Sequence, residues 1–118
     1  MTEAKTYAGG CHCGQVRYEL TAEIASAYDC NCSICMKRGA LWGFVDGDKF
    51  TLKSGEDALK DYLFNKNAIH HLFCSSCGVG SFSRGMHDGR PIVAVNLRCL
   101  DEIDLAALPR VPVDGKSL

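Results

Sequence analysis

Cysteine is the residue type in this sequence whose number and spacing could do chemistry, with 8 among 118 residues. Three clusters hold most of them: Cys11 and Cys13 (C-x-C), Cys30, Cys32 and Cys35 (C-x-C-x-x-C), and Cys74 and Cys77 (C-x-x-C). Thiolates one or two residues apart can bind a common ion because tight turns bring their side chains together, whereas a disulfide between them would be strained. Gly14 and Gly78 supply the permissive backbone that such turns need. The spacing therefore predicts metal binding.

The redox compartment decides which cysteine chemistry applies. The first ten residues lack the apolar stretch of a secretory signal. No window approaches the roughly 18 apolar residues of a membrane span. We therefore expect a cytoplasmic protein with reduced thiols, where clustered cysteines more often bind metal or do chemistry than form bridges.

The clustered cysteines do not divide into two complete four-cysteine sites. The economical division joins the two pairs into one closed tetrahedral site, the four-cysteine group Cys11, Cys13, Cys74 and Cys77. The remaining cluster, the triplet Cys30, Cys32 and Cys35, would hold a second ion with an open fourth position, as in catalytic zinc sites. Alternatively, Cys99, a histidine or an acidic side chain completes the second site, and both ions are structural. The spacing leaves both open, and iron in a rubredoxin-like site is a weaker alternative.

Length and composition favour a single globular domain over residues 1–118. Hydrophobic residues make up 47% and charged residues 23%, both near the average for such proteins. The net charge of -1 gives no bulk attraction to nucleic acid or to an anionic membrane, so we expect neither as a partner.

Short runs with strand-like patterns must position these cysteines. Strands are predicted at Gln15 to Leu20, Leu41 to Asp46, Phe50 to Lys53, Tyr62 to Phe64, Ile69 to Phe73, Val79 to Ser83 and Pro91 to Leu97. Turns are expected at Gly47 to Lys49 and Asn65 to Asn67. Helical signals are confined to Ser33 to Arg38, stopped by Gly39, and to Asp101 to Leu108, with Asp101 as the cap. The fold class is therefore mainly β with one or two short helices.

Other residues have a functional and an ordinary interpretation. His70 and His71 are neighbours in a predicted strand, so only one of them can face a site. Several cations near the motifs could hold an anionic substrate or be ordinary surface charges: Lys37, Arg38, Arg84, Arg90 and Arg98. Cys99 is interpreted as a small buried hydrophobic residue rather than a ligand.

The cysteine clusters lie in longer motifs: Gly10-Cys11-His12-Cys13-Gly14-x-Val16-x-Tyr18, Cys30-Asn31-Cys32-Ser33-x-Cys35 and Phe73-Cys74-x-x-Cys77-Gly78. Asn96-x-Arg98-Cys99-Leu100 and Asp114-Gly115 follow them. In this order and spacing, the motifs resemble the glutathione-dependent formaldehyde-activating enzyme family, whose domain also occurs in centromere protein V. The resemblance covers about Ala8 to Gly115, and the chain is similar to the small members of the family.

The resemblance implies a compact zinc-stabilised fold of short, twisted antiparallel sheets. It also implies two Zn²⁺ ions per chain, a structural ion in the four-cysteine group and a catalytic-type ion in the triplet. The implied activity is that of a carbon–sulfur lyase that joins glutathione, or another thiol, reversibly to formaldehyde or another small aldehyde. The alternative is a non-catalytic binding module in which both metal sites are structural. No catalytic residue beyond the second zinc site is assigned, and no oligomeric state follows.

Overall fold

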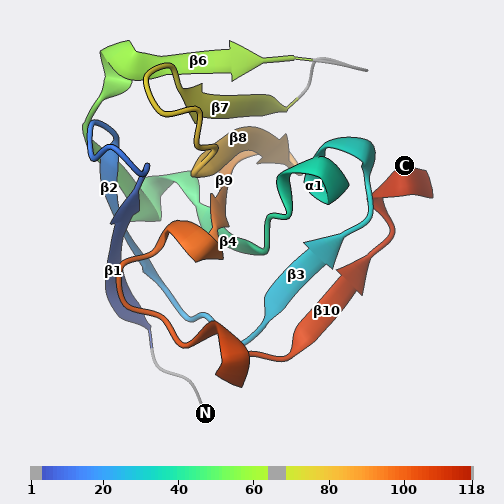
Figure 1. Cartoon of the computed structure of the whole chain (residues 1–118). Coiled ribbons are helices and arrows are strands. Elements are labelled where there is room, and N and C mark those ends of the chain that lie inside the picture. Colours follow the sequence, from blue (N-terminus) through green and yellow to red (C-terminus); the bar gives the residue numbers. More distant parts are fainter. Residues whose placement is uncertain (1–3, 64–68, 118) are drawn as a thin grey trace.

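A computed structural model describes residues 4–63 and 69–117, which form ten strands and one α-helix (Figure 1). The strands are β1 (Lys5–Gly10), β2 (Arg17–Ala22), β3 (Ala27–Cys30), β4 (Trp42–Asp46), β5 (Phe50–Ser54), β6 (Leu59–Tyr62), β7 (His70–Cys74), β8 (Phe82–His87), β9 (Arg90–Asn96) and β10 (Arg110–Val113). The helix is α1 (Ser33–Arg38). Short 3₁₀ turns follow several strands: η1 (Gly47–Lys49), η2 (Glu56–Ala58), η3 (Leu97–Cys99), η4 (Leu105–Ala107) and η5 (Gly115–Ser117). The predicted mainly β fold class is confirmed.

The strands form two sheets. The smaller sheet has the order β1-β2-β5, and the larger has the order β10-β3-β4-β9-β8-β7-β6. All pairs are antiparallel except β3 with β10, which run parallel and lie side by side in Figure 1. This parallel pair departs from the expected antiparallel sheets, because the C-terminal strand returns along β3 rather than through a hairpin.

Three aromatic rings join the two sheets in the core. Tyr18 of β2 lies 5.0 Å from Phe50 of β5 and 5.5 Å from Phe82 of β8, measured between ring centroids. Tyr18 is buried and donates a hydrogen bond of 3.0 Å to the carbonyl oxygen of Ser81, which satisfies its hydroxyl group. Val93 and Val95 of β9 complete this core from the larger sheet.

Several predicted elements are confirmed with shifted ends. The helix over Ser33–Arg38 is found as predicted, and Gly39 ends it in the left-handed region with φ 67°. The run Val79 to Ser83 begins its strand only at Phe82, because the carbonyl of Val79 accepts the amide of Cys74 in a turn. The predictions for Phe64 and for the turn at 65–67 lie outside the described residues.

The predicted helix from Asp101 to Leu108 is wrong. Only Leu105–Ala107 is helical, as a single 3₁₀ turn that follows Asp104. Asp101 is an ion-pair partner of Arg17 rather than a cap, and its amide donates to the carbonyl of Ala8. These contacts hold the segment against the β1–β2 hairpin and prevent a helix from starting there.

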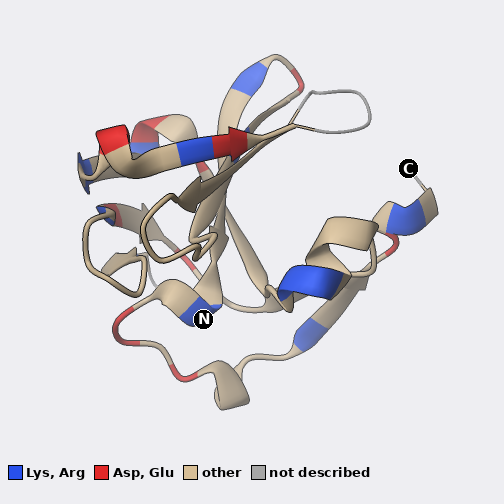
Figure 2. Cartoon of the chain, turned by 45° about the horizontal axis from the view of Figure 1, so that its top comes forward, with Lys and Arg blue, Asp and Glu red and all other residues tan. Residues whose placement is uncertain are grey.

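The distribution of charge is mixed. Figure 2 shows basic segments at the end of α1 and near the C-terminus. The last turn of α1 contains Lys37 and Arg38, and η5 contains Lys116. No helix among the described residues is both long and apolar enough to cross a membrane.

Candidate metal centres

The four-cysteine group is assembled from two distant turns. Cys11 and Cys13 lie in the β1–β2 connection, whereas Cys74 ends β7 and Cys77 lies in the turn that follows. Gly14 and Gly78 adopt positive φ angles of 85° and 80°, which allow both turns to close. The predicted partners therefore meet, and the group connects the small sheet to the large one.

The sulfur positions fit a tetrahedral ion. The Sγ atom of Cys13 lies 3.6 Å from that of Cys11 and 3.7 Å from that of Cys74, and all four lie within 4.8 Å of one another. Four thiolates at the zinc–sulfur distance of about 2.3 Å would lie about 3.8 Å apart. A disulfide would need about 2.05 Å, and all eight thiols are free. This group could hold a metal ion.

Backbone amides stabilise anionic sulfur in this group. The amide of Val16 donates to Cys11 Sγ over 3.3 Å. The amides of Cys13 and Val79 lower the pKa of the Cys77 thiol to about 6. Metal binding requires thiolates, so these amides prepare the group for an ion.

The triplet is built at the start of α1. Cys30 ends β3, Cys32 precedes the helix, and Cys35 lies in its first turns, where the amide of Met36 donates to the carbonyl of Cys32 over 3.0 Å. The three sulfur atoms lie within 4.8 Å of one another. Within residues 4–63 and 69–117, no fourth cysteine, histidine or carboxylate joins them. The group could hold a metal ion and leave a fourth position for another ligand.

Burial distinguishes the sulfur atoms of the triplet. Cys35 packs with Ala40 and Trp42 in a small apolar cluster of its own. Burial raises the pKa of the Cys35 thiol to about 12, with a further contribution from the Cys32 thiol beside it. The indole Nε1 of Trp42 acts against this by donating to Cys35 Sγ over 3.2 Å. The cysteine spacing gave no sign of this hydrogen bond, which comes from a strand outside the motif.

The C-terminal segment closes one side of the triplet. The side chain of Asn31 donates to Asp114 Oδ1 and accepts from the amide of Lys116, both over 2.9 Å. Gly115 lies so close that a Cβ atom placed there would be 2.5 Å from Cys30 Sγ. Asn31, inside the cysteine motif, therefore fixes the tail against the site.

Cys99 and the histidines lie outside both groups. Cys99 is half-buried in η3, and burial raises the pKa of its thiol to about 11. His70 is exposed and pairs with Asp61, whereas His71 is buried, so the two point to opposite faces as predicted. His12 is exposed between two of the cysteines.

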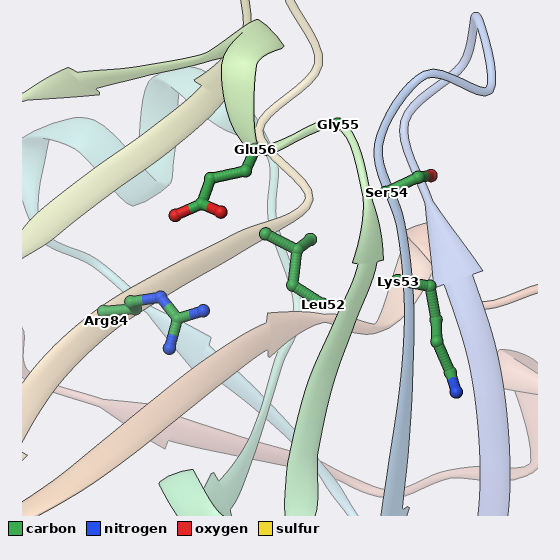
Figure 3. A pocket seen from close by; sticks show the side chains of 6 residues that line it. All are labelled: Leu52, Lys53, Ser54, Gly55, Glu56 and Arg84. Carbon is green, nitrogen blue, oxygen red and sulfur yellow. The ribbon is translucent and has the colours of Figure 1, made fainter.

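The candidate cations have different surroundings. Arg84 stacks over the rings of Phe50 and Phe82, at 5.4 and 5.3 Å, and lines a pocket with residues of β5 and η2 (Figure 3). That pocket faces the core side of the large sheet. Trp42, whose indole contacts the triplet, is on the other side, because neighbouring residues of a strand alternate between faces. Arg84 is therefore not part of the triplet site. Arg38 is half-buried beside Gly80, and the Nε atom of Arg98 donates to the carbonyl of Gly39.

A family model and a solved structure both match most of the chain. The family described as "Glutathione-dependent formaldehyde-activating enzyme" matches residues 6–113. The fold is similar to the crystal structure of a protein from Rhodobacter sphaeroides, with a TM-score of 0.76 and 28% sequence identity, over 88% of this chain and 99% of that chain. The chain therefore belongs to the glutathione-dependent formaldehyde-activating enzyme family.

Proposed function

We propose that the protein is a zinc-dependent carbon–sulfur lyase that joins a thiol such as glutathione reversibly to formaldehyde or another small aldehyde. One observation carries the proposal: three sulfur atoms gather at the start of α1 without a fourth protein ligand in the described part of the chain. Family membership supplies the class of substrates.

The donor set of the triplet supports zinc. Cys30, Cys32 and Cys35 would supply three thiolates, the ligand type that zinc accepts readily. Bound there, the ion would supply Lewis acidity, which favours deprotonation of a substrate thiol and polarises an aldehyde carbonyl. The indole of Trp42 offsets charge on Cys35 through its hydrogen bond.

The proposed reaction balances without a redox partner. In the forward direction a carbon–sulfur bond forms between the thiol sulfur and the aldehyde carbon, and the carbonyl π bond breaks. The thiol proton ends on the former carbonyl oxygen, which gives a hydroxyl group. The reverse reaction is the lyase step. Zinc has no redox chemistry, and the reaction needs none.

We assign the structural ion to the four-cysteine group. Its two turns come from different sheets, so an ion held there would cross-link them. Reduced thiols are required for both groups, which supports the cytoplasm as the location.

The test compares metal content and chemistry in matched variants. Cys32→Ser removes one thiolate of the triplet, and Cys99→Ser removes a thiol outside both groups as the control. Metal analysis should give two zinc ions per chain for the wild type and for Cys99→Ser, and one for Cys32→Ser. Adduct formation from glutathione and formaldehyde should be lost only in Cys32→Ser. Wild-type activity in Cys32→Ser would contradict the catalytic role of the triplet.

A further inference from the structure

One row of residues crosses the face of the large sheet on which the triplet lies. The strand registers place five residues opposite one another: Tyr62, His71, Ser83, Ala94 and Phe44. Trp42, whose indole contacts Cys35, is two residues from Phe44 and therefore on the same face. Ala94 also packs against the apolar cluster that contains Cys35 and Trp42. The row thus extends from the triplet across the sheet.

Two polar groups near this row are buried without a partner in the described part of the chain. Ser83 is only 4% exposed, and its Oγ atom has no hydrogen-bond partner. The Nη1 atom of Arg38, at the end of α1, is also buried and unpartnered. Buried polar groups in folded proteins are nearly always satisfied, so each of these two groups is a candidate contact for a ligand from outside the chain.

The charge of Arg38 acts on groups of both the triplet and the row. Burial lowers the pKa of Arg38, and charge on Cys35 acts in the opposite direction. Burial also lowers the pKa of His71, and the positive charge of Arg38 contributes to this. Arg38 is thus within electrostatic range of Cys35 and of His71, the cross-strand neighbour of Ser83.

The guanidinium of Arg38 packs against Gly80, which has no side chain to exclude it. A Cβ atom at Gly80 would lie 2.6 Å from Arg38 Nη1, so a larger residue there would displace the side chain. Among the described residues, no carboxylate lies within 4.0 Å of this guanidinium. A half-buried cation without a counter-ion, packed against Gly80 three residues before Ser83, is suited to bind an anion from outside the chain.

We propose that Arg38 and Ser83 form a carboxylate subsite, and that this subsite selects thiols carrying a carboxylate over neutral thiols. The inference deepens the proposed function, because the thiol end of the same substrate would reach the triplet. A guanidinium can bind a carboxylate through two parallel hydrogen bonds, and the serine hydroxyl can donate a third. Phe44 and Tyr62, at the two ends of the row, are each about half exposed and offer apolar surface for the carbon chain.

The test uses a ligand that has the carboxylates but no free thiol. Binding of S-methylglutathione and of its diester is measured by isothermal titration calorimetry on the zinc-loaded protein. Arg38→Gln removes the cation, and Lys37→Gln is the matched control because it removes the same charge from an exposed position of α1. Ser83→Ala is a second variant that removes only a hydroxyl group.

Arg38→Gln should weaken S-methylglutathione binding about 10- to 100-fold, and Ser83→Ala about 3- to 10-fold. Binding of the diester should change less than about threefold in both, and Lys37→Gln should bind both ligands like the wild type. Two results would overturn the subsite: Arg38→Gln weakens binding of S-methylglutathione and of its diester equally, or Arg38→Gln leaves binding of S-methylglutathione unchanged. If Arg38→Gln does not fold, two measurements replace it. The wild type should bind S-methylglutathione more tightly than its diester, and Ser83→Ala should weaken only S-methylglutathione binding; the opposite results would overturn the subsite.

Together with the adduct assay of the proposed function, this binding experiment separates the two proposals. A wild type that binds the acid through Arg38 but forms no thiol–aldehyde adduct would refute the lyase and support the subsite. A wild type that forms the adduct, with acid binding unaffected by Arg38→Gln, would support the lyase and refute the subsite.

Discussion

Gly115→Ala should damage the triplet site selectively. The added Cβ atom would lie 2.5 Å from Cys30 Sγ and 3.2 Å from Cys32 Cβ. Non-bonded heavy atoms prefer separations of about 3.5–4.0 Å, so the sulfur or the tail must move by about 1 Å. Metal–ligand distances tolerate only about 0.2 Å. A shift of this size in Cys30 would therefore remove it from good coordination geometry.

The tail resists the movement that would relieve the contact. Asn31 fixes it through its side-chain bonds to Asp114 and Lys116, and its own amide donates to Val113 over 3.0 Å. Disturbing groups that orient metal ligands typically costs 10- to 100-fold in metal affinity, or about 1.4–2.8 kcal/mol. We expect a loss of this size at the triplet, with no change at the four-cysteine group.

A chromophoric chelator titrated against the zinc-loaded protein measures both affinities in one experiment. Gly85→Ala is the control, because its Cβ atom would make only an ordinary contact of 3.7 Å with Ile69. Combining Gly115→Ala with Asn31→Ala should restore part of the affinity by releasing the tail. Unchanged affinity at the triplet in Gly115→Ala would refute this account of how the tail is positioned.

Four further outcomes are expected. Cys74→Ser should give insoluble or molten protein, because a structural zinc site contributes on the order of 10 kcal/mol to folding; a soluble variant with an unchanged melting temperature would contradict the structural assignment. Trp42→Phe removes a hydrogen bond to Cys35 worth about 1.5–3 kcal/mol, and chelator competition should show weaker binding of the second ion only. Tyr18→Phe should lower the free energy of unfolding in urea by about 1 kcal/mol through the lost bond to the Ser81 carbonyl, with both metal ions retained. As the pH falls from 8 to 5, protons compete with the ions for the thiolates, and the triplet should release its ion first because it has one thiolate fewer. Simultaneous release of both ions, measured by metal analysis after dialysis, would contradict this order.

Local sequence signals predicted the helix and the cysteine groups well. The helix over Ser33–Arg38 and its glycine stop depend on neighbouring residues alone, so the sequence pattern was sufficient. The cysteine spacing likewise requires only tight turns. The grouping of Cys11 and Cys13 with Cys74 and Cys77 joins segments that are far apart in the sequence. It could still be predicted by counting ligands, because the two pairs together supply the four thiolates of a tetrahedral site.

Long-range contacts explain what the sequence could not predict. β3 and β10 are short, and β10 contains Pro112, so neither has a clear alternating pattern; each becomes a strand by pairing with the other. Asp101 has the chemistry of a helix cap, but its ion pair with Arg17 prevails. The surroundings of Arg38 depend on Gly80, 42 positions further along the chain, and only the folded structure brings them together.

The most direct test of the central claim is the exchange rate between glutathione, ¹³C-formaldehyde and their adduct, followed by NMR while zinc is added to the metal-depleted protein. The first ion should fill the four-cysteine group and restore the melting temperature without catalysis. The second should fill the triplet, and the exchange rate above the uncatalysed reaction should rise in proportion to its occupancy. A full rate at one ion per chain, or no added rate at two, would contradict a catalytic zinc at Cys30, Cys32 and Cys35.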